Sequence, residues 1–178
     1  MDDLTQLALA AQRGDVVALE DLIRRTQPDV WRLCAHLGGR QRADDLTQET
    51  FLRAWRSLPS YRAESSVRTW LLAVARHTVL DAARAATRRP TTVSLGDDAY
   101  GERWVGQPGS DPASIVTTER LLAGLAPERR LALFLTQLIG LSYAEAAAVC
   151  EVPVGTIRSR VARGRQDLAG DLDAAVTP

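Results

Sequence analysis

Apolar residues recur at intervals of three and four positions along most of the chain, the spacing that places them on one face of an α-helix. Runs of alternating β-branched residues bounded by turns, which would indicate strands, are missing. The pattern therefore predicts an all-α protein. It is interrupted over residues 89–112, where three prolines and four glycines occur without a sustained period, as in a linker.

Proline and glycine divide the periodic stretches into helices, because proline favours the first turn of a helix and glycine follows the last. Before the linker, the pattern predicts helices over residues 3–12, 15–37, 42–57 and 66–88, and Pro28 is a candidate break or kink in the second. After the linker, it predicts helices over residues 113–124, 127–139, 142–150 and 154–170. We thus expect two small helical domains joined by a flexible linker, residues 1–88 and residues 113–178, the second with a short C-terminal tail.

Composition narrows the class of protein. With 46% hydrophobic and 25% charged residues, the 178-residue chain resembles a soluble globular protein. No apolar run approaches the roughly 20 residues that cross a bilayer, so we expect a cytoplasmic protein without membrane insertion. Cys34 and Cys150 lack the C-x-x-C or C-x-x-H spacing of a zinc site. We expect both to be buried apolar residues, with no metal and no cofactor.

Charge must be considered by position, because 22 basic and 22 acidic residues give a formal net charge of +0. Two segments are locally basic. One is the stretch that carries Arg158, Arg160, Arg163 and Arg165 without an acid among them. The other is residues 62–89, in which six arginines against two acids leave a local charge of about +4.

The first basic stretch lies in the second of two predicted helices, SYAEAAAVC and PVGTIRSRVARGRQDLA, which are separated by a short turn. Ser142 and Glu145 have the spacing of a capping box, which fixes where the first of these helices begins. One side of the second helix is apolar and is expected to pack against Ala146, Ala147 and Val149; it comprises Ile157, Val161, Gly164 and Leu168, with Val154 nearby.

The opposite side of that helix is small, polar and cationic, and comprises Gly155, Thr156, Ser159, Ala162 and Arg163, flanked by Arg158 and Arg160. Small residues let a helix approach the DNA backbone, while arginines reach phosphates or the O6 and N7 of guanine. This is the arrangement of a helix-turn-helix in the major groove. The alternative is an ordinary helical hairpin with a solvated arginine surface.

The helix over residues 42–58 is amphipathic, with a core side and an outward side of different composition. Leu46, Thr50, Ala54 and Leu58 lie on the core side, whereas Asp45, Gln48, Glu49 and Leu52 project the other way. An exposed leucine among acids suits a protein contact better than a DNA contact, because the carboxylates would repel phosphates. A solvated acidic helix with one stray leucine is the alternative.

The helix over residues 66–88 and the loop before it form the second basic surface. The outward side carries Arg76, His77, Leu80 and Arg84, and the buried side is expected to hold Leu71, Val74, Ala75, Thr78, Val79 and Ala82. The preceding loop, PSYRAESS, is polar and could accept an unstacked base. Arginines at the helix end also favour the helix dipole, and Trp55, Tyr61 and Trp70 are as well explained as core residues.

Three segments, DDLTQETFLRAW, YRAESSVRTWLLAVAR and LSYAEAAAVCEVPVGTIRSRVARGR, occur in this order and at spacings that resemble the extracytoplasmic-function (ECF) sigma factors of bacterial RNA polymerase. The arrangement is most similar to actinobacterial members of the σC kind. The resemblance covers nearly the whole chain apart from the linker and the last few residues. It implies a σ2-like helical bundle over residues 1–88 and a σ4-like helix-turn-helix domain over residues 113–178.

The resemblance also implies roles for the surfaces described above. Core RNA polymerase, through its β′ clamp helices and its β subunit, would be a partner, with the β′ contact at Asp45, Gln48, Glu49 and Leu52. The minus-ten element would be captured and opened by Tyr61, Arg62, Ser65, Ser66, Arg76, His77, Leu80 and Arg84. The minus-thirty-five element would be read by Thr156, Arg158, Ser159, Arg160, Ala162 and Arg163, although Ala162 is shorter than the residue of some relatives.

Further partners follow from the same resemblance: promoter DNA, and an anti-sigma factor, which is common in the family. In relatives a flexible linker runs through the RNA exit region of the polymerase, a role that residues 89–112 could fill.

Two other functions fit parts of the sequence. A DNA-binding regulator with a sensing or dimerising first half would bind its site tightly without polymerase, whereas two small basic surfaces on a neutral chain predict weak binding by the free protein. A small helical enzyme is disfavoured, because no G-x-G-x-x-G, G-x-x-x-x-G-K or H-E-x-x-H motif is present. We therefore do not expect an enzyme.

Overall fold

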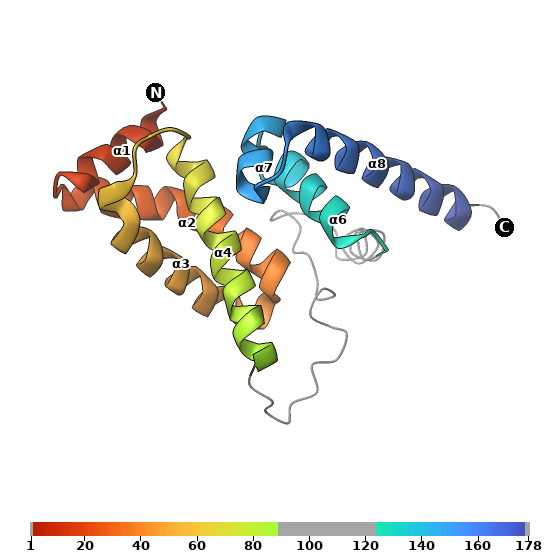
Figure 1. The fold of residues 1–178 in the computed structure, drawn as a ribbon, viewed down its shortest axis with the longest axis horizontal. Coiled ribbons are helices and arrows are strands. Elements are labelled where there is room, and N and C mark those ends of the chain that lie inside the picture. The colour runs from red at the N-terminus through yellow and green to blue at the C-terminus, as the bar shows by residue number, and fades with distance from the viewer. Residues whose placement is uncertain (1, 89–123, 177–178) are drawn as a thin grey trace. The chain divides into compact units, whose positions relative to one another are not determined.

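A computed structural model describes residues 2–88 and 124–176, and every regular element in these ranges is a helix (Figure 1). The predicted all-α fold is confirmed. The chain divides into two compact units, residues 1–99 and 100–178, which we call the N-terminal and C-terminal units. The predicted linker, and the predicted helix over residues 113–124 apart from Gly124, lie outside the described residues.

Over residues 2–88, the N-terminal unit contains four α-helices and two short 3-10 turns: α1 (Asp3–Gln12), α2 (Val16–Gly38), η1 (Arg40–Arg42), α3 (Ala43–Ser57), η2 (Leu58–Ser60) and α4 (Val67–Arg88). All four α-helices agree with the predicted ranges to within one residue. Local chemistry fixes these ends. The side chain of Asp2 accepts a hydrogen bond from Thr5 N at 2.9 Å and that of Asp15 accepts one from Ala18 N at 3.0 Å, each capping a helix.

Helix α2 is the centre of this unit and packs against α1, α3 and α4. It runs through Pro28 as one continuous helix, so a break at this proline is wrong. A proline inside a helix costs about 3 kcal/mol. The helix nevertheless continues because the residues that follow, Val30, Leu33 and Cys34, are fully or almost fully buried, and burial of such side chains contributes about 1.5 to 3 kcal/mol each.

The described part of the C-terminal unit contains α6 (Pro127–Leu133), a π-helical turn η4 (Phe134–Leu138), α7 (Tyr143–Cys150) and α8 (Val154–Val176). The predicted helix over residues 127–139 is therefore partly wrong, since its second half is wider than an α-helix. The wider turn brings Phe134 and Ile139, five residues apart, toward the same side, and Ile139 N donates to Phe134 O at 3.0 Å. Both side chains are buried.

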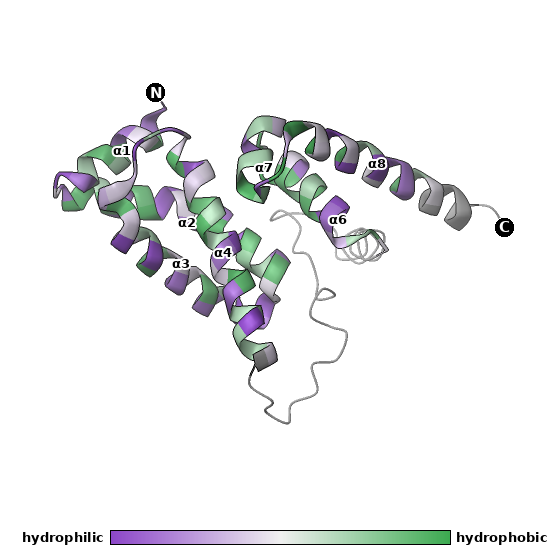
Figure 2. Cartoon of the chain, in the orientation of Figure 1, coloured by the Kyte–Doolittle hydropathy of each residue, from purple (hydrophilic) through white to green (hydrophobic). Residues whose placement is uncertain are grey.

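The predicted helix pair is present in α7 and α8. Ser142 and Glu145 form the predicted capping box at the start of α7. Glu151 ends α7 in the left-handed conformation with φ of 57°, and α8 begins at Val154 after Pro153. Figure 2 shows that α7 is mainly hydrophobic, whereas hydrophilic residues recur along α8. Helix α7 is thus largely core, while α8 has one face available for contacts.

Candidate functional site

The outward face of α8 has the predicted chemistry. Ile157 and Val161 are buried, and Gly164 lies so close to α6 that a Cβ atom there would meet Leu133 Cδ1 at 2.8 Å. On the other side, Gly155, Arg158, Ser159, Ala162 and Arg163 are exposed, and Thr156 and Arg160 are half-buried. One expectation is wrong: Val154 is 37% exposed instead of packing with the core side, because it begins the helix at the edge of the unit.

Most arginines that the structure describes have an ionic or hydrogen-bonding partner, whereas those of this face do not. Within residues 2–88 and 124–170, no ion pair or side-chain hydrogen bond engages Arg158, Arg160 or Arg163. Elsewhere, Arg68 pairs with Asp29, and Arg129 pairs with Asp167 at 2.6 Å. Even Arg165, at the end of the basic stretch, donates to Gln137 Oε1 at 3.1 Å. The face is therefore cationic without internal neutralisation, as binding to phosphates requires.

The outward face of α3 is acidic and apolar together. Asp45 and Gln48 are exposed, and Leu52 is 52% exposed. Glu49 is half-buried and accepts a hydrogen bond from Arg53 Nε at 2.7 Å. Arg53 also donates to Asp81 Oδ2 of α4 at 2.8 Å, and this hydrogen bond lowers the pKa of the Asp81 carboxyl. Arg53 therefore joins α3 to α4 through these two carboxylates.

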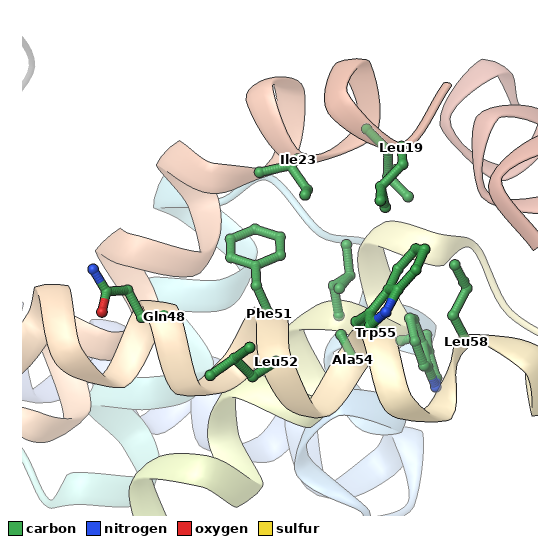
Figure 3. Close-up of a pocket in the computed structure, with 11 residues that line it drawn as sticks. Leu19, Ile23, Gln48, Phe51, Leu52, Ala54, Trp55 and Leu58 are labelled. Atoms are coloured by element: carbon green, nitrogen blue, oxygen red, sulfur yellow. The ribbon is translucent and has the colours of Figure 1, made fainter. Parts of the chain in front are cut away.

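An apolar groove of about 410 Å³ lies beside this face, between α2 and α3. Figure 3 shows Leu19 and Ile23 of α2 opposite Phe51 and Trp55 of α3, with Gln48 at one end and Leu58 at the other. Leu52, at the margin of the groove, belongs to the predicted docking set. The predicted polar and acidic face and the groove thus form one continuous surface, which we call the α3 surface.

The groove contains residues that sequence reasoning missed or misplaced. Trp55 is 50% exposed, so its interpretation as a core residue is wrong. It lies beside Phe51 at the spacing of four residues, an aromatic pair that could have indicated an apolar edge on the outward face. Leu19 and Ile23 could not be separated from the core positions of α2, because Leu22, which lies between them, has the same apolar character and is buried.

The loop from Tyr61 to Ser66 precedes α4. Arg62 and Ser65 are exposed as predicted for a base-accepting loop. Tyr61 is only 7% exposed: its ring packs on Trp70 with ring centroids 5.0 Å apart, and its hydroxyl donates to Ser65 O at 2.6 Å. Ser66 caps α4, since its Oγ accepts from Thr69 N at 3.2 Å. In the free protein, Tyr61 and Ser66 therefore shape the loop.

The outward side of α4 continues from this loop. His77 and Arg84 are exposed, and Arg76 and Leu80 are half-buried. Arg84 lies 3.5 Å from Asp81, a weak pair at the surface. On the inner side, Leu71, Ala75, Thr78 and Val79 are buried as predicted, and Val74 and Ala82 are half-buried. The loop and this side of α4 together place the predicted minus-ten residues on one stretch of the N-terminal unit.

The positions of the two cysteines do not favour a reactive thiol. Both are buried, and burial raises the pKa of the Cys34 thiol, which disfavours the reactive thiolate. Among the residues that the structure describes, no group of three His, Cys, Asp or Glu side chains is close enough to hold a metal ion. None of the helices in this part of the chain is both long and apolar enough to cross a membrane.

Comparison with known proteins gives two family matches, the Sigma-70 region 2 family over residues 22–89 and the Sigma-70 region 4 family over residues 116–168. The chain is 51% identical over 173 residues to the ECF RNA polymerase sigma factor SigC of Mycobacterium tuberculosis, covering 96% of this chain and 91% of that one. It is 33% identical over 166 residues to the ECF RNA polymerase sigma-E factor of Escherichia coli, covering 87% of this chain and 86% of that one.

Two solved structures share the fold. The sigma factor RpoE of Bartonella quintana, in complex with the anti-sigma factor NepR, matches with a TM-score of 0.74 at 25% identity over 89% of this chain and 98% of that chain. CnrH, in complex with the cytosolic domain of CnrY, matches with a TM-score of 0.73 at 25% identity over 97% of this chain and 99% of that chain.

Proposed function

The chain belongs to the extracytoplasmic-function sigma factors of RNA polymerase, which act in promoter-specific transcription initiation, and from this premise we propose which of its surfaces binds which partner. The proposal assigns the α3 surface to core RNA polymerase. It assigns the loop before α4 and the outward side of α4 to the minus-ten element, and the outward face of α8 to the minus-thirty-five element.

The observation that carries the proposal is the acid-free face of α8 with its unpaired arginines. Arginine that is not engaged in an ion pair can bind phosphate, or guanine O6 and N7, without first breaking an internal contact. The residues assigned to the minus-thirty-five duplex are Thr156, Arg158, Ser159, Arg160, Ala162 and Arg163. Gly155 and Ala162 keep the backbone accessible, so α8 can enter a major groove closely.

The α3 surface has the chemistry of a protein-binding site. Gln48 and Leu52 line a groove that consists almost entirely of apolar atoms and contains a half-exposed tryptophan, and Asp45 and Glu49 lie on the same helix. Aromatic residues at the centre and polar residues at the rim are typical of protein interfaces. Acidic groups would repel DNA at the same place, so we assign this surface to the β′ clamp helices of core polymerase.

For the minus-ten element, we assign direct contacts to Arg62 and Ser65, which are exposed on the loop, and to Arg76, His77, Leu80 and Arg84 along α4. Tyr61 and Ser66 are included as residues that maintain the shape of the loop, because their side chains are already engaged within it. A base that leaves the DNA stack is held by hydrogen bonds to its edge, and the exposed polar side chains of this loop would supply them.

The remaining assignments rest on the family. The domain boundaries at residues 88 and 113, the path of residues 89–112 through the RNA exit region and a contact with the β subunit are part of the proposal. An anti-sigma partner is supported by the related sigma factor RpoE of Bartonella quintana, whose structure is a complex with the anti-sigma factor NepR. The protein would act in the cytoplasm, where the chromosome and the polymerase lie, and would perform no catalysis of its own.

The test is reconstitution with core RNA polymerase, followed by sequencing of transcript starts on genomic DNA. We expect starts downstream of a shared pair of elements. Arg158→Ala or Arg163→Ala should weaken use of such a promoter by about 1 to 3 kcal/mol, whereas Arg165→Ala, whose guanidinium is held by Gln137, should weaken it less. If the free protein gives a tight, specific gel shift but core polymerase starts no specific transcripts in its presence, the protein is a DNA-binding regulator instead.

The docking assignment has a separate test. Gln48→Ala with Leu52→Ala should reduce co-purification with core enzyme without changing helix content. The matched control removes the same kinds of side chain from α1 and α2, where Gln6 and Val17 are exposed, by Gln6→Ala with Val17→Ala. If both double variants bind core enzyme like the parent, α3 is not the docking surface.

A further inference from the structure

Helix α1 makes contacts that none of the assigned surfaces requires. The amide of Gln12, at its last position, donates one hydrogen bond to Leu58 O and one to Tyr61 O, both at 2.7 Å. These partners lie 46 and 49 residues away along the chain. Leu58 begins η2, and Tyr61 begins the loop that precedes α4. One side chain thus joins α1 to the start of the loop.

The same helix also holds the other end of the loop. Thr5, which is buried, accepts a hydrogen bond from Val67 N at 3.1 Å through its hydroxyl oxygen. Val67 is the first residue of α4. The Thr5 hydroxyl in turn donates to Asp2 Oδ2 at 2.6 Å, so the N-cap of α1 orients it. Two points of α1, two helical turns apart, therefore hold the two ends of residues 58–67.

From Tyr61 to Ser66 the chain has no helix or strand to maintain its shape. Ala63 adopts φ of 55°, a conformation that is unfavourable for a residue with a Cβ atom. Inside the loop, the Tyr61 hydroxyl bonded to Ser65 O and the Tyr61 ring packed on Trp70 supply the tertiary support. A loop in such a conformation persists only when its surroundings fix it, and α1 supplies the fixed points.

We propose that α1 presets the shape of the minus-ten loop and that Gln12 is a positioning residue for base recognition, an inference that rests on the proposed role of this loop. Gln12 does not contact DNA in this scheme. Its two hydrogen bonds hold the carbonyls at Leu58 and Tyr61, and thereby fix where Arg62 and Ser65 present their side chains. A loop that is ordered before binding avoids the entropic cost of being ordered by the base.

The choice of Gln12 instead of Thr5 follows from what each contact does. Thr5 caps the backbone of α4, so its loss would disturb the helix as well as the loop. Gln12 is half-buried and bonds only to carbonyls at the loop entrance, so its substitution perturbs the loop with less effect on the core. Gln12→Met keeps the length of the side chain and removes both donors.

The experiment measures base preference with the full chain bound to core polymerase. Transcription is compared between a promoter found by its transcript start and versions with single substitutions in the minus-ten or the minus-thirty-five element. For Gln12→Met we expect the preference at the minus-ten positions to fall about tenfold, as for the loss of one to two hydrogen bonds. Preference at the minus-thirty-five positions and affinity for core polymerase should stay at the parental level.

If Gln12 had only a structural role, Gln12→Met would reduce transcription equally from all promoter versions and would lower core affinity and thermal stability. That result would overturn the proposal. If Gln12→Met does not fold, Gln12→Asn serves instead, since it keeps the amide but is too short by one methylene to reach both carbonyls. If the variant that folds, Gln12→Met or Gln12→Asn, keeps the parental minus-ten preference, the proposal is also overturned.

Arg62→Ala and Ser65→Ala separate this inference from the assignment on which it rests. If they reduce minus-ten preference while the Gln12 variant does not, only the role of Gln12 is wrong. If neither of them changes the preference, the loop is not the recognition element, and both assignments fail together.

Discussion

Helices α3 and α8 have similar inward faces, but their outward faces differ in chemistry. Each buries a narrow apolar stripe against its own unit, with Leu46 and Ala54 in α3 and Ile157 and Val161 in α8. The outward side of α3 exposes Leu52 and Trp55 beside an apolar groove, among acidic residues. The outward side of α8 exposes small residues and arginines.

The two surfaces differ both in the sign of their charges and in the pairing of their arginines. Arg53 of α3 is held between Glu49 and Asp81, so its charge is already used inside the protein. Arg158 and Arg163 of α8 have no such partner in the described part of the chain. A chain of zero net charge can therefore present one face suited to a protein and another suited to DNA.

The largest expected effect is the loss of DNA binding when the charge of the α8 face is reversed. Arg158→Glu with Arg163→Glu should weaken binding of the polymerase complex to a promoter by about 3 kcal/mol or more, because two cationic contacts become repulsive. Titration of labelled promoter at several salt concentrations measures this, and the slope of log affinity against log salt should fall by about 2. Core affinity should stay unchanged; its loss instead would mean that α8 binds protein.

The complementary change on the α3 surface is Trp55→Ala. A large aromatic side chain that is half-exposed beside a groove is the typical centre of a protein interface, so we expect a loss of about 2 to 4 kcal/mol in core affinity. The measurement is a binding titration with core polymerase. Trp31→Ala is the matched control: Trp31 of α2 does not line the groove, and its Nε1 donates to Asp44 Oδ1 at 2.7 Å, so its removal should lower thermal stability while core affinity stays at the parental level. Equal core affinity of Trp55→Ala and the parent would contradict the interface.

Local signals explain why the helices could be predicted so closely. The ends of α1, α2 and α7 are set by Asp2, Asp15 and Ser142, whose side chains bond to backbone only three residues away. The inward and outward positions of α3 and α8 also follow from spacing alone, since a helical wheel needs no knowledge of distant residues. Leu46, Thr50, Ile157 and Val161 are buried as predicted for this reason.

Features that depend on distant residues could not be predicted in the same way. The groove exists because α2 and α3 lie side by side, so neither Leu19 nor Trp55 indicates it alone. Gln12 bonds to carbonyls more than 40 residues away, and no local pattern marks such a residue. The π-helical turn follows from the need to bury both Phe134 and Ile139 in one core, a demand that arises only after packing.

The inner and outer faces of α8 differ in how much volume they tolerate, and valine substitutions would measure this. Gly164→Val should destabilise the protein by about 1 to 3 kcal/mol, because a Cβ at this position already meets Leu133 Cδ1 at 2.8 Å. Ala162→Val, two residues earlier on the exposed face, should change stability by no more than about 0.5 kcal/mol. Thermal unfolding followed by circular dichroism compares the two, and equal midpoints would show that the inner face is not closely packed.

The smallest expected effect is on the pH dependence of stability, and it concerns the side chains that cap helix N-termini. Partial burial, the strongest single influence on Asp2, would raise its pKa, but hydrogen bonds from the side chain and backbone of Thr5 outweigh it and hold the pKa below the ordinary value of 3.8. A carboxyl with a lowered pKa stabilises the folded state fully above that ordinary value, and the contribution is lost as the pH falls through the folded pKa.

Asp2→Asn keeps a capping oxygen but removes the charge, so the stability difference between parent and variant should shrink from pH 6 to pH 3. The difference at pH 6 should be at most about 0.5 kcal/mol, because Asp2 is exposed and water screens its charge. Urea unfolding at the two pH values measures it. Ser66→Asn at the start of α4 is the matched control, since it replaces one neutral cap by another, bonds to the uncharged Thr69 and should show no such trend. A difference for Asp2→Asn that grows as the pH falls would mean that its charge does not support α1.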